Sequence, residues 1–280
     1  QVVDHAPELV ERVWPFVVER AAAVVVVAIC AHEKPFRSAA GMDWFGRTEA
    51  MGSAWCLKGP RGAVADLARA QRALAPLPSS SVVASRAFDE DLLRWEVDHF
   101  REWALEARGI TLSEGDRATF AEAASTLAQR IAAWPRGFVH RDYQSRNLMV
   151  RERASADPTL VWIDFQDALL GPRVYDLVAL LNDSYQSFDR AFVEARLDEY
   201  ADHHQLDALG RQAVGREFDT VTVQRKLKDA GRFVFIDRVR GNPGFLGFVE
   251  PTIEKVFGAL ERLEGDPVLD RLHAMLRRLL

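Results

Sequence analysis

The stretch that decides the fold runs from Gly137 to Val150 and reads GFVHRDYQSRNLMV. Its two ends are apolar, and its middle, 140–147, is polar. Short apolar segments on either side of a polar stretch predict two strands, 138–139 and 148–150, that frame a loop. A scaffold of this kind holds loop side chains rigid while leaving them open to a substrate.

The chemistry of this loop depends on its spacing. His140 and Asp142 form a His-x-Asp pattern, and Asn147 follows the aspartate by five positions. A second segment, 160–163, is apolar, predicts a third strand, and is followed directly by Asp164. A base, an amide and a second carboxylate in this order are what a magnesium-dependent phosphoryl transferase requires.

Each of the three residues has a predicted role, and two of them, Asp142 and Asn147, also have a structural alternative. Asp142 is the predicted catalytic base, because a carboxylate can take the proton of an attacking hydroxyl; the alternative is a turn or capping residue. Asn147 offers an amide oxygen to magnesium, or else closes an Asx-turn. Asp164 is the second predicted metal ligand, since a carboxylate beside a buried strand needs a compensating charge.

Two further residues are predicted to support the loop. His140 precedes the base and is expected to hold the loop by hydrogen bonds rather than act as an acid or a ligand. The segment 171–177, GPRVYDL, predicts a turn into a helix, and Asp176 within it would cap that helix or hold the loop.

These motifs carry a resemblance. HRDYQSRN followed by VWIDFQDALLGPRVYDLVALL is similar to the aminoglycoside phosphotransferase and choline kinase family, a small-molecule branch of the protein-kinase-like fold. The segments HRDYQSRNLM, DFQDA and QRKLK with its following Gly231 and Phe233 resemble bacterial sugar kinases that phosphorylate the anomeric hydroxyl of N-acetylmuramate and N-acetylglucosamine. FDEDLLRWEVDHFREW is similar to the helix before the catalytic loop of those kinases.

The resemblance implies ATP as co-substrate, Mg²⁺, and an amino sugar as acceptor, with Asp142 as base and Asn147 and Asp164 as metal ligands. One alternative is a catalytically impaired, kinase-like binding or regulatory protein with an incomplete ATP-binding lobe. Another is an unrelated hydrolase with His140 and Asp142 as metal ligands. That interpretation requires further His or Asp ligands at suitable spacing, and the sequence shows none.

The expected fold class is α+β and protein-kinase-like. Residues 86–280 are predicted to form a mostly helical C-lobe with short catalytic-loop strands, and residues 1–85 a short or divergent N-lobe and hinge. No G-x-G-x-x-G is present in the sequence. Lys34 and Lys58 are the candidate phosphate contacts, with solvated surface lysines as the alternative. Either the N-lobe is abbreviated, or the chain lacks part of its start.

Apolar periodicity and breakers predict the remaining elements. We expect a strand at 24–29, a loop-rich stretch at 35–62, a linker at 77–81, and helices at 1–20, 62–74, 91–107, 113–134, 175–182, 190–200, 212–235, 251–263 and 267–280.

The acceptor is expected beside Asp142. Five residues are candidate substrate contacts: Gln144, Arg146, Asp183, Gln224 and Lys228. A polycationic aminoglycoside would require an acidic pocket, whereas the basic residues Arg146, Arg225 and Lys228 suit an anionic or neutral sugar.

Composition narrows the function classes. The 280 residues carry a formal net charge of −5 and no basic tract, which argues against a nucleic-acid partner. The longest apolar run, Ala21 to Ala31, is shorter than the ~20 residues that cross a bilayer, so no membrane partner is expected. Two cysteines, Cys30 and Cys56, form no disulfide framework. A cytoplasmic enzyme with a small-molecule substrate is therefore expected; oligomeric state is left open.

Overall fold

The structure is a computed structural model that describes residues 25–26, 62–153 and 156–280. Several predictions fall outside these residues: the helix at 1–20, almost all of the loop-rich stretch at 35–62, and both candidate phosphate contacts, Lys34 and Lys58. Of the strand predicted at 24–29, the structure describes Val25–Val26, which form β1.

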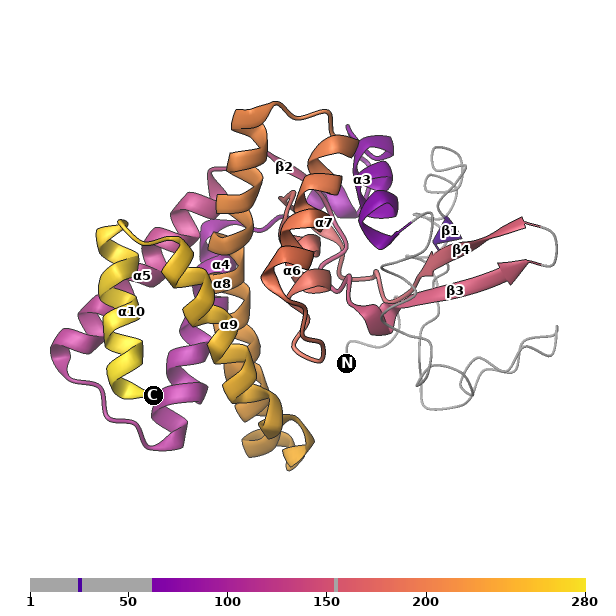
Figure 1. Cartoon of the computed structure of the whole chain (residues 1–280). Coiled ribbons are helices and arrows are strands. Elements are labelled where there is room, and N and C mark those ends of the chain that lie inside the picture. Colours follow the sequence, from indigo (N-terminus) through magenta and orange to yellow (C-terminus); the bar gives the residue numbers. More distant parts are fainter. Residues whose placement is uncertain (1–24, 27–61, 154–155) are drawn as a thin grey trace.

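The described residues form a mostly helical protein with two small sheets (Figure 1). This confirms the α+β class. The helices are α3 (Ala63–Ala73), α4 (Glu90–His99), α5 (Glu114–Ala132), α6 (Tyr175–Leu181), α7 (Arg190–His203), α8 (Ala208–Arg240), α9 (Val249–Arg262) and α10 (Pro267–Leu279). The short helical segments are η1 (Val83–Ser85), η2 (Phe100–Leu105), η3 (Glu106–Arg108), η4 (Ser145–Asn147) and η5 (Pro243–Phe248).

Side-chain caps explain where several helices begin. Ser113 caps α5 in a reciprocal capping box with Asp116, at the start that the sequence predicts. Asp89, Asp189 and Asp207 accept a hydrogen bond from a backbone N–H in the first turn of α4, α7 and α8. Each cap satisfies a donor that has no partner inside its helix.

The three-stranded sheet has the order β1-β4-β3. Strands β3 (Leu148–Arg153) and β4 (Ala156–Trp162) are antiparallel, with Leu148 opposite Trp162, and β1 is parallel to β4. The end of this hairpin lies next to the polar loop, because the Ile163 N–H donates to the Asn147 carbonyl oxygen at 3.0 Å.

The second sheet pairs β2 (Arg136–Val139) with β5 (Leu169–Pro172) in antiparallel register. The predicted turn into a helix at 171–177 is confirmed at Arg173 and Val174, which precede α6, but Gly171 and Pro172 at its start belong to β5. Pro172 ends the strand opposite Arg136, where a missing N–H is tolerated. A Cβ at Gly171 would lie 2.7 Å from the Phe88 ring, so this tight packing requires glycine.

The long helix α8 joins two hydrophobic clusters. Near its start, Phe218 packs with residues of α3, β2, the polar loop, α6 and α7. Further along, Leu227 packs with residues of η2, α5, α9 and α10. Figure 1 shows α8 between these groups, with the β3–β4 hairpin extending on the side away from α10.

Helix α3 belongs to the first cluster. The hydroxyl of Tyr143 donates to the Ala63 carbonyl oxygen at 2.8 Å, and the hydroxyl of Tyr200 donates to Gln71 at 2.6 Å. The helix is thus attached to the polar loop and α7, while the predicted domain boundary after residue 85 stays a prediction. Within the described ranges, no helix combines the length and apolarity needed to span a bilayer.

Candidate active site

Asp176, at the start of α6, holds the backbone of the polar loop. Its carboxylate accepts hydrogen bonds from the backbone N–H groups of His140 at 2.7 Å and Arg141 at 3.0 Å. Complete burial raises the pKa of Asp176 to about 7, although the two N–H donors and Arg225 oppose that shift. The contacts orient the start of the loop that carries Asp142.

Two residues flanking the site adopt left-handed backbone conformations that non-glycine residues rarely occupy. The φ angle is 77° at Arg141 and 66° at Asp164. Such conformations persist only where surrounding contacts enforce them, and they concentrate at functional sites. At Arg141 those contacts include the bond to Asp176 and an ion pair to the buried Glu96 at 3.1 Å.

Arg225 of α8 connects the loop to the helical core. Its fully buried guanidinium donates to the Arg141 carbonyl oxygen at 2.8 Å and lies 3.6 Å from Oδ1 of Asp142. The same group lies 4.7 Å from the centre of the Tyr175 ring, a cation–π contact. Asp142 is 35% exposed, so its carboxylate is both held and accessible.

His140 supports the loop by packing rather than by side-chain hydrogen bonds. Its buried ring contacts Tyr143 and Trp162 edge-on, at centroid distances of 5.9 Å in each case. Among the described residues, neither ring nitrogen has a hydrogen-bond partner of good geometry. Burial lowers the pKa of His140 to about 4, against the opposing charge of Asp142. The expected hydrogen bond is made by the backbone N–H, to Asp176.

Asn147 and Asp164 lie at the same end of the β3–β4 hairpin. The Asn147 amide nitrogen donates to the Asp142 carbonyl oxygen at 2.9 Å, which leaves the amide oxygen available as a ligand. Asp164 is exposed, and one of its oxygens accepts from Gln166 at 2.9 Å. No cluster of three or more His, Cys, Asp or Glu residues suited to a metal occurs in the part described. An amide oxygen and a carboxylate nevertheless fit Mg²⁺, which takes few protein ligands and completes its shell with phosphate oxygens and water.

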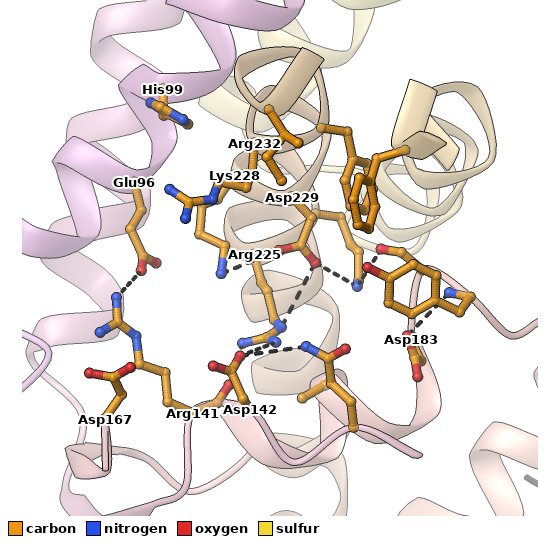
Figure 2. Close-up of a pocket in the computed structure, with 18 of the residues that line it drawn as sticks. Glu96, His99, Arg141, Asp142, Asp167, Asp183, Arg225, Lys228, Asp229 and Arg232 are labelled. Carbon is orange, nitrogen blue, oxygen red and sulfur yellow. Dashed lines mark hydrogen bonds and ion pairs between the residues drawn. The ribbon is translucent and has the colours of Figure 1, made fainter. Parts of the chain in front are cut away.

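A cavity of about 410 Å³ opens above Asp142. It lies between α4, the polar loop, the residues after α6, and α8, and Figure 2 shows acidic and basic side chains converging on it. Its acidic residues are Glu96, Asp142, Asp167, Asp183 and Asp229; its basic residues are Arg141, Arg225, Lys226, Lys228 and Arg232; its aromatic residues include Trp95, Tyr185, Phe233 and Phe245. The size and mixed lining are typical of a small-molecule site.

The model of the phosphotransferase enzyme family matches residues 42–209, more than half of the chain. The chain belongs to the phosphotransferase enzyme family.

Three relatives of this chain carry one name, N-acetylmuramate/N-acetylglucosamine kinase. The protein from Pseudomonas putida is 36% identical over 180 residues, which cover 62% of this chain and 49% of the relative. The protein from Pseudomonas aeruginosa is 35% identical, and the match covers 58% of this chain and 48% of the relative. The protein from Neisseria meningitidis is 30% identical, and the match covers 65% of this chain and 59% of the relative. The chain therefore spans about half the length of the curated relatives it matches.

The structure brings some of the predicted substrate contacts together and separates others. Gln144, Asp183 and Lys228 line the cavity with Asp142. Arg146 is exposed and stacks on Tyr185, with its guanidinium 3.7 Å from the ring centre. It is not among the lining residues.

Gln224 is also absent from the cavity lining. It is fully buried, and its amide nitrogen donates to Glu96 at 2.9 Å. In the structure this residue therefore supports Glu96, which in turn holds Arg141.

Sequence reasoning missed several residues of the cavity. Glu96 and Trp95 lie on α4, which the sequence predicts as an ordinary amphipathic helix, and Asp229 and Arg232 lie on α8. Glu96 is completely buried, and a buried carboxylate requires a partner. A glutamate at a core-facing position of the predicted helix was therefore a signal that it pairs with another polar residue. No local signal marked Arg232.

Proposed function

We propose that this chain is the catalytic part of an ATP- and magnesium-dependent phosphotransferase that phosphorylates a hydroxyl of an amino sugar of the N-acetylmuramate/N-acetylglucosamine type. One observation carries the proposal. Asp142 is held at the base of a mixed-polarity cavity by Arg225, with Asn147 and Asp164 beside the same loop.

Asp142 would act as the base. The acceptor hydroxyl attacks the γ-phosphorus of ATP, its proton passes to the Asp142 carboxylate, and the bond between the γ-phosphorus and the bridging oxygen breaks to release ADP. Contact with Arg225 and the anchored backbone of Arg141 would fix the carboxylate while the hydroxyl is in line. Positioning of this kind supplies much of the rate of phosphoryl transfer.

Asn147 and Asp164 would hold the metal. When bound, magnesium neutralises charge on the phosphates. The hydrogen bond from the Asn147 amide to the Asp142 carbonyl oxygen would keep the distance between the metal ligand Asn147 and the base Asp142 constant. The two-lobe, kinase-like arrangement and the phosphate contacts Lys34 and Lys58 are part of the proposal, as is a cytoplasmic location.

The lining of the cavity favours a sugar as acceptor. A sugar presents hydroxyls for polar side chains such as Gln144 and Asp183, and an apolar ring face for aromatic ones such as Trp95. An aminoglycoside is less suitable, because its ammonium groups would meet Lys228 and Arg232 in the same cavity.

ADP release with three acceptors tests the proposal. The chain, with Mg²⁺ and ATP, is given N-acetylmuramate, N-acetylglucosamine or kanamycin, and binding of Mg-ATP is followed in parallel by thermal shift. We expect turnover with the two amino sugars and stabilisation by Mg-ATP. Kanamycin as the best acceptor would overturn the substrate class. Absence of both turnover and stabilisation would favour the kinase-like binding or regulatory protein instead.

A further inference from the structure

Two basic residues of α8 share one face of the cavity. Lys228 and Arg232 are one helical turn apart, and both line it. Like charges at this spacing repel one another. Figure 2 shows them on the same side of the cavity as Glu96 and His99, across from Asp183. Such a pair is unfavourable unless an acidic group lies nearby.

The protein's own acids compensate this pair only in part. The Lys228 ammonium lies 3.2 Å from Asp229, but that carboxylate also contacts Lys226 at 2.8 Å and Arg225 at 3.9 Å. One carboxylate therefore serves three buried or half-buried cations.

Arg232 is exposed at the cavity and forms no ion pair with any residue that the structure describes; its guanidinium lies 5.4 Å from the centre of the Phe235 ring. The nearby carboxylate of Glu96 is already engaged by Arg141 and Gln224. Burial and then the charges of Arg232 and Lys228 lower the pKa of His99. All three residues line the same cavity. The face thus carries an excess of positive charge.

An aromatic surface adjoins this positive face. Trp95 lines the cavity from α4 and is 57% exposed, an unusual state for so large an apolar side chain. Its ring lies 5.6 Å from that of His99. A sugar ring packed on Trp95 would bring its substituents within the region of Arg232.

We propose that Arg232, assisted by Lys228, binds an acidic substituent of the acceptor sugar and so determines the preference for an acid-bearing over a neutral amino sugar. The guanidinium suits this role because it pairs with a carboxylate through two parallel hydrogen bonds. The inference rests on the proposed function. N-acetylmuramate carries a carboxylate on its lactyl ether, and N-acetylglucosamine is the matched sugar without it.

Arg232→Gln provides the direct test, with Arg240→Gln as control. Arg240 is an exposed arginine of the same helix that does not line the cavity. We compare kcat/KM for N-acetylmuramate with that for N-acetylglucosamine. Loss of a charged hydrogen bond predicts a roughly 10- to 100-fold fall in this ratio for Arg232→Gln. Arg232→Lys should restore part of it, and Lys228→Gln should lower the ratio independently.

The outcomes separate this inference from the proposed function. A fall in the ratio confined to the cavity variants supports the role of Arg232. Equal losses for both sugars, or the same fall in Arg240→Gln, would overturn it while leaving the sugar kinase in place. If the unmodified chain turns over neither sugar, the proposed function fails and the inference fails with it.

Discussion

The guanidinium of Arg225 lies 3.6 Å from the carboxylate of Asp142. The two residues are distant in the sequence, and one is on α8 and the other in the loop between β2 and β3. Because Arg225 also donates to the Arg141 carbonyl oxygen at 2.8 Å, it contacts both the side chain and the backbone of the loop. The position of the proposed base therefore depends on a helix of the core.

The first prediction concerns this contact. Arg225→Lys keeps the charge but loses the planar group that reaches the Arg141 carbonyl and stacks on Tyr175. We expect kcat to fall about 10-fold, as for the loss of one charge-assisted hydrogen bond, with a smaller change in KM. Steady-state kinetics measure both. Arg216→Lys, an exposed position on α8, is the control, and an unchanged kcat in Arg225→Lys would exclude a positioning role.

Asp142→Asn removes the proposed proton acceptor while keeping the size of the side chain. We expect kcat to fall by roughly 10²- to 10⁴-fold, the usual contribution of a general base. Since Asp142 is 35% exposed, the melting temperature and the stabilisation by Mg-ATP should stay close to those of the unmodified chain. Asp91→Asn, at an exposed position on α4, is the control for an aspartate-to-asparagine substitution outside the cavity. A fully active Asp142→Asn variant would disprove the assignment of the base.

Gly231 is where α8 crosses α4. A Cβ at this glycine would lie 2.6 Å from the His99 carbonyl oxygen and 2.9 Å from the Phe100 Cα, and both are backbone atoms. At this crossing the chain of α4 continues as the π-helical segment η2, a departure from the regular helix predicted for 91–107. The two helices therefore depend on the missing side chain to approach each other.

Gly231→Ala should destabilise the protein by about 1–3 kcal/mol, because the backbone must move to accept the methyl group. Gly215→Ala is the matched control, since nothing lies within 4 Å of a Cβ at that position of the same helix. It should instead stabilise by about 0.5–1 kcal/mol through helix propensity. Urea unfolding measures both changes. Equal changes in the free energy of unfolding for Gly231→Ala and Gly215→Ala would mean that the close approach of α8 and α4 at Gly231 does not require glycine.

The last prediction is a pH dependence from His140. Its pKa is about 4 in the folded protein, where burial opposes the charged form, against about 6.5 in the unfolded chain. Between these values the unfolded state binds more protons, so the stability contribution is complete above about pH 6.5 and is lost as the pH falls towards 4.

His140→Leu should reduce this slope by up to one proton, about 1.4 kcal/mol per pH unit. Urea unfolding of both proteins between pH 7 and 5 measures the difference. The variant's absolute stability is not the readout, because the substitution also changes core packing. An equal pH dependence of the free energy of unfolding in the two proteins would show that the pKa of His140 is not lowered in the folded state.

Local signals explain which parts of the fold were predictable. The capping box at Ser113 and the apolar periodicity of α6 to α10 involve residues a few positions apart. These helices occur where they are predicted, except that α8 begins earlier and ends later than the predicted 212–235. Strand β5 was missed because Gly171 and Pro172 are ordinarily turn residues. Its pairing with β2 and the packing of Gly171 on Phe88 are long-range contacts that no local pattern contains.

The sequence by itself determined the order of Asp142, Asn147 and Asp164 and hence the chemistry expected of them, because one loop and one hairpin set their mutual positions. Only the tertiary structure decided which distant side chains complete the site. Glu96 and Arg225 come from α4 and α8, and the packing of those helices brings them to Arg141 and Asp142. Burial of apolar faces drives that packing without regard to sequence separation, so cavity residues such as Arg232 become recognisable only after the chain has folded.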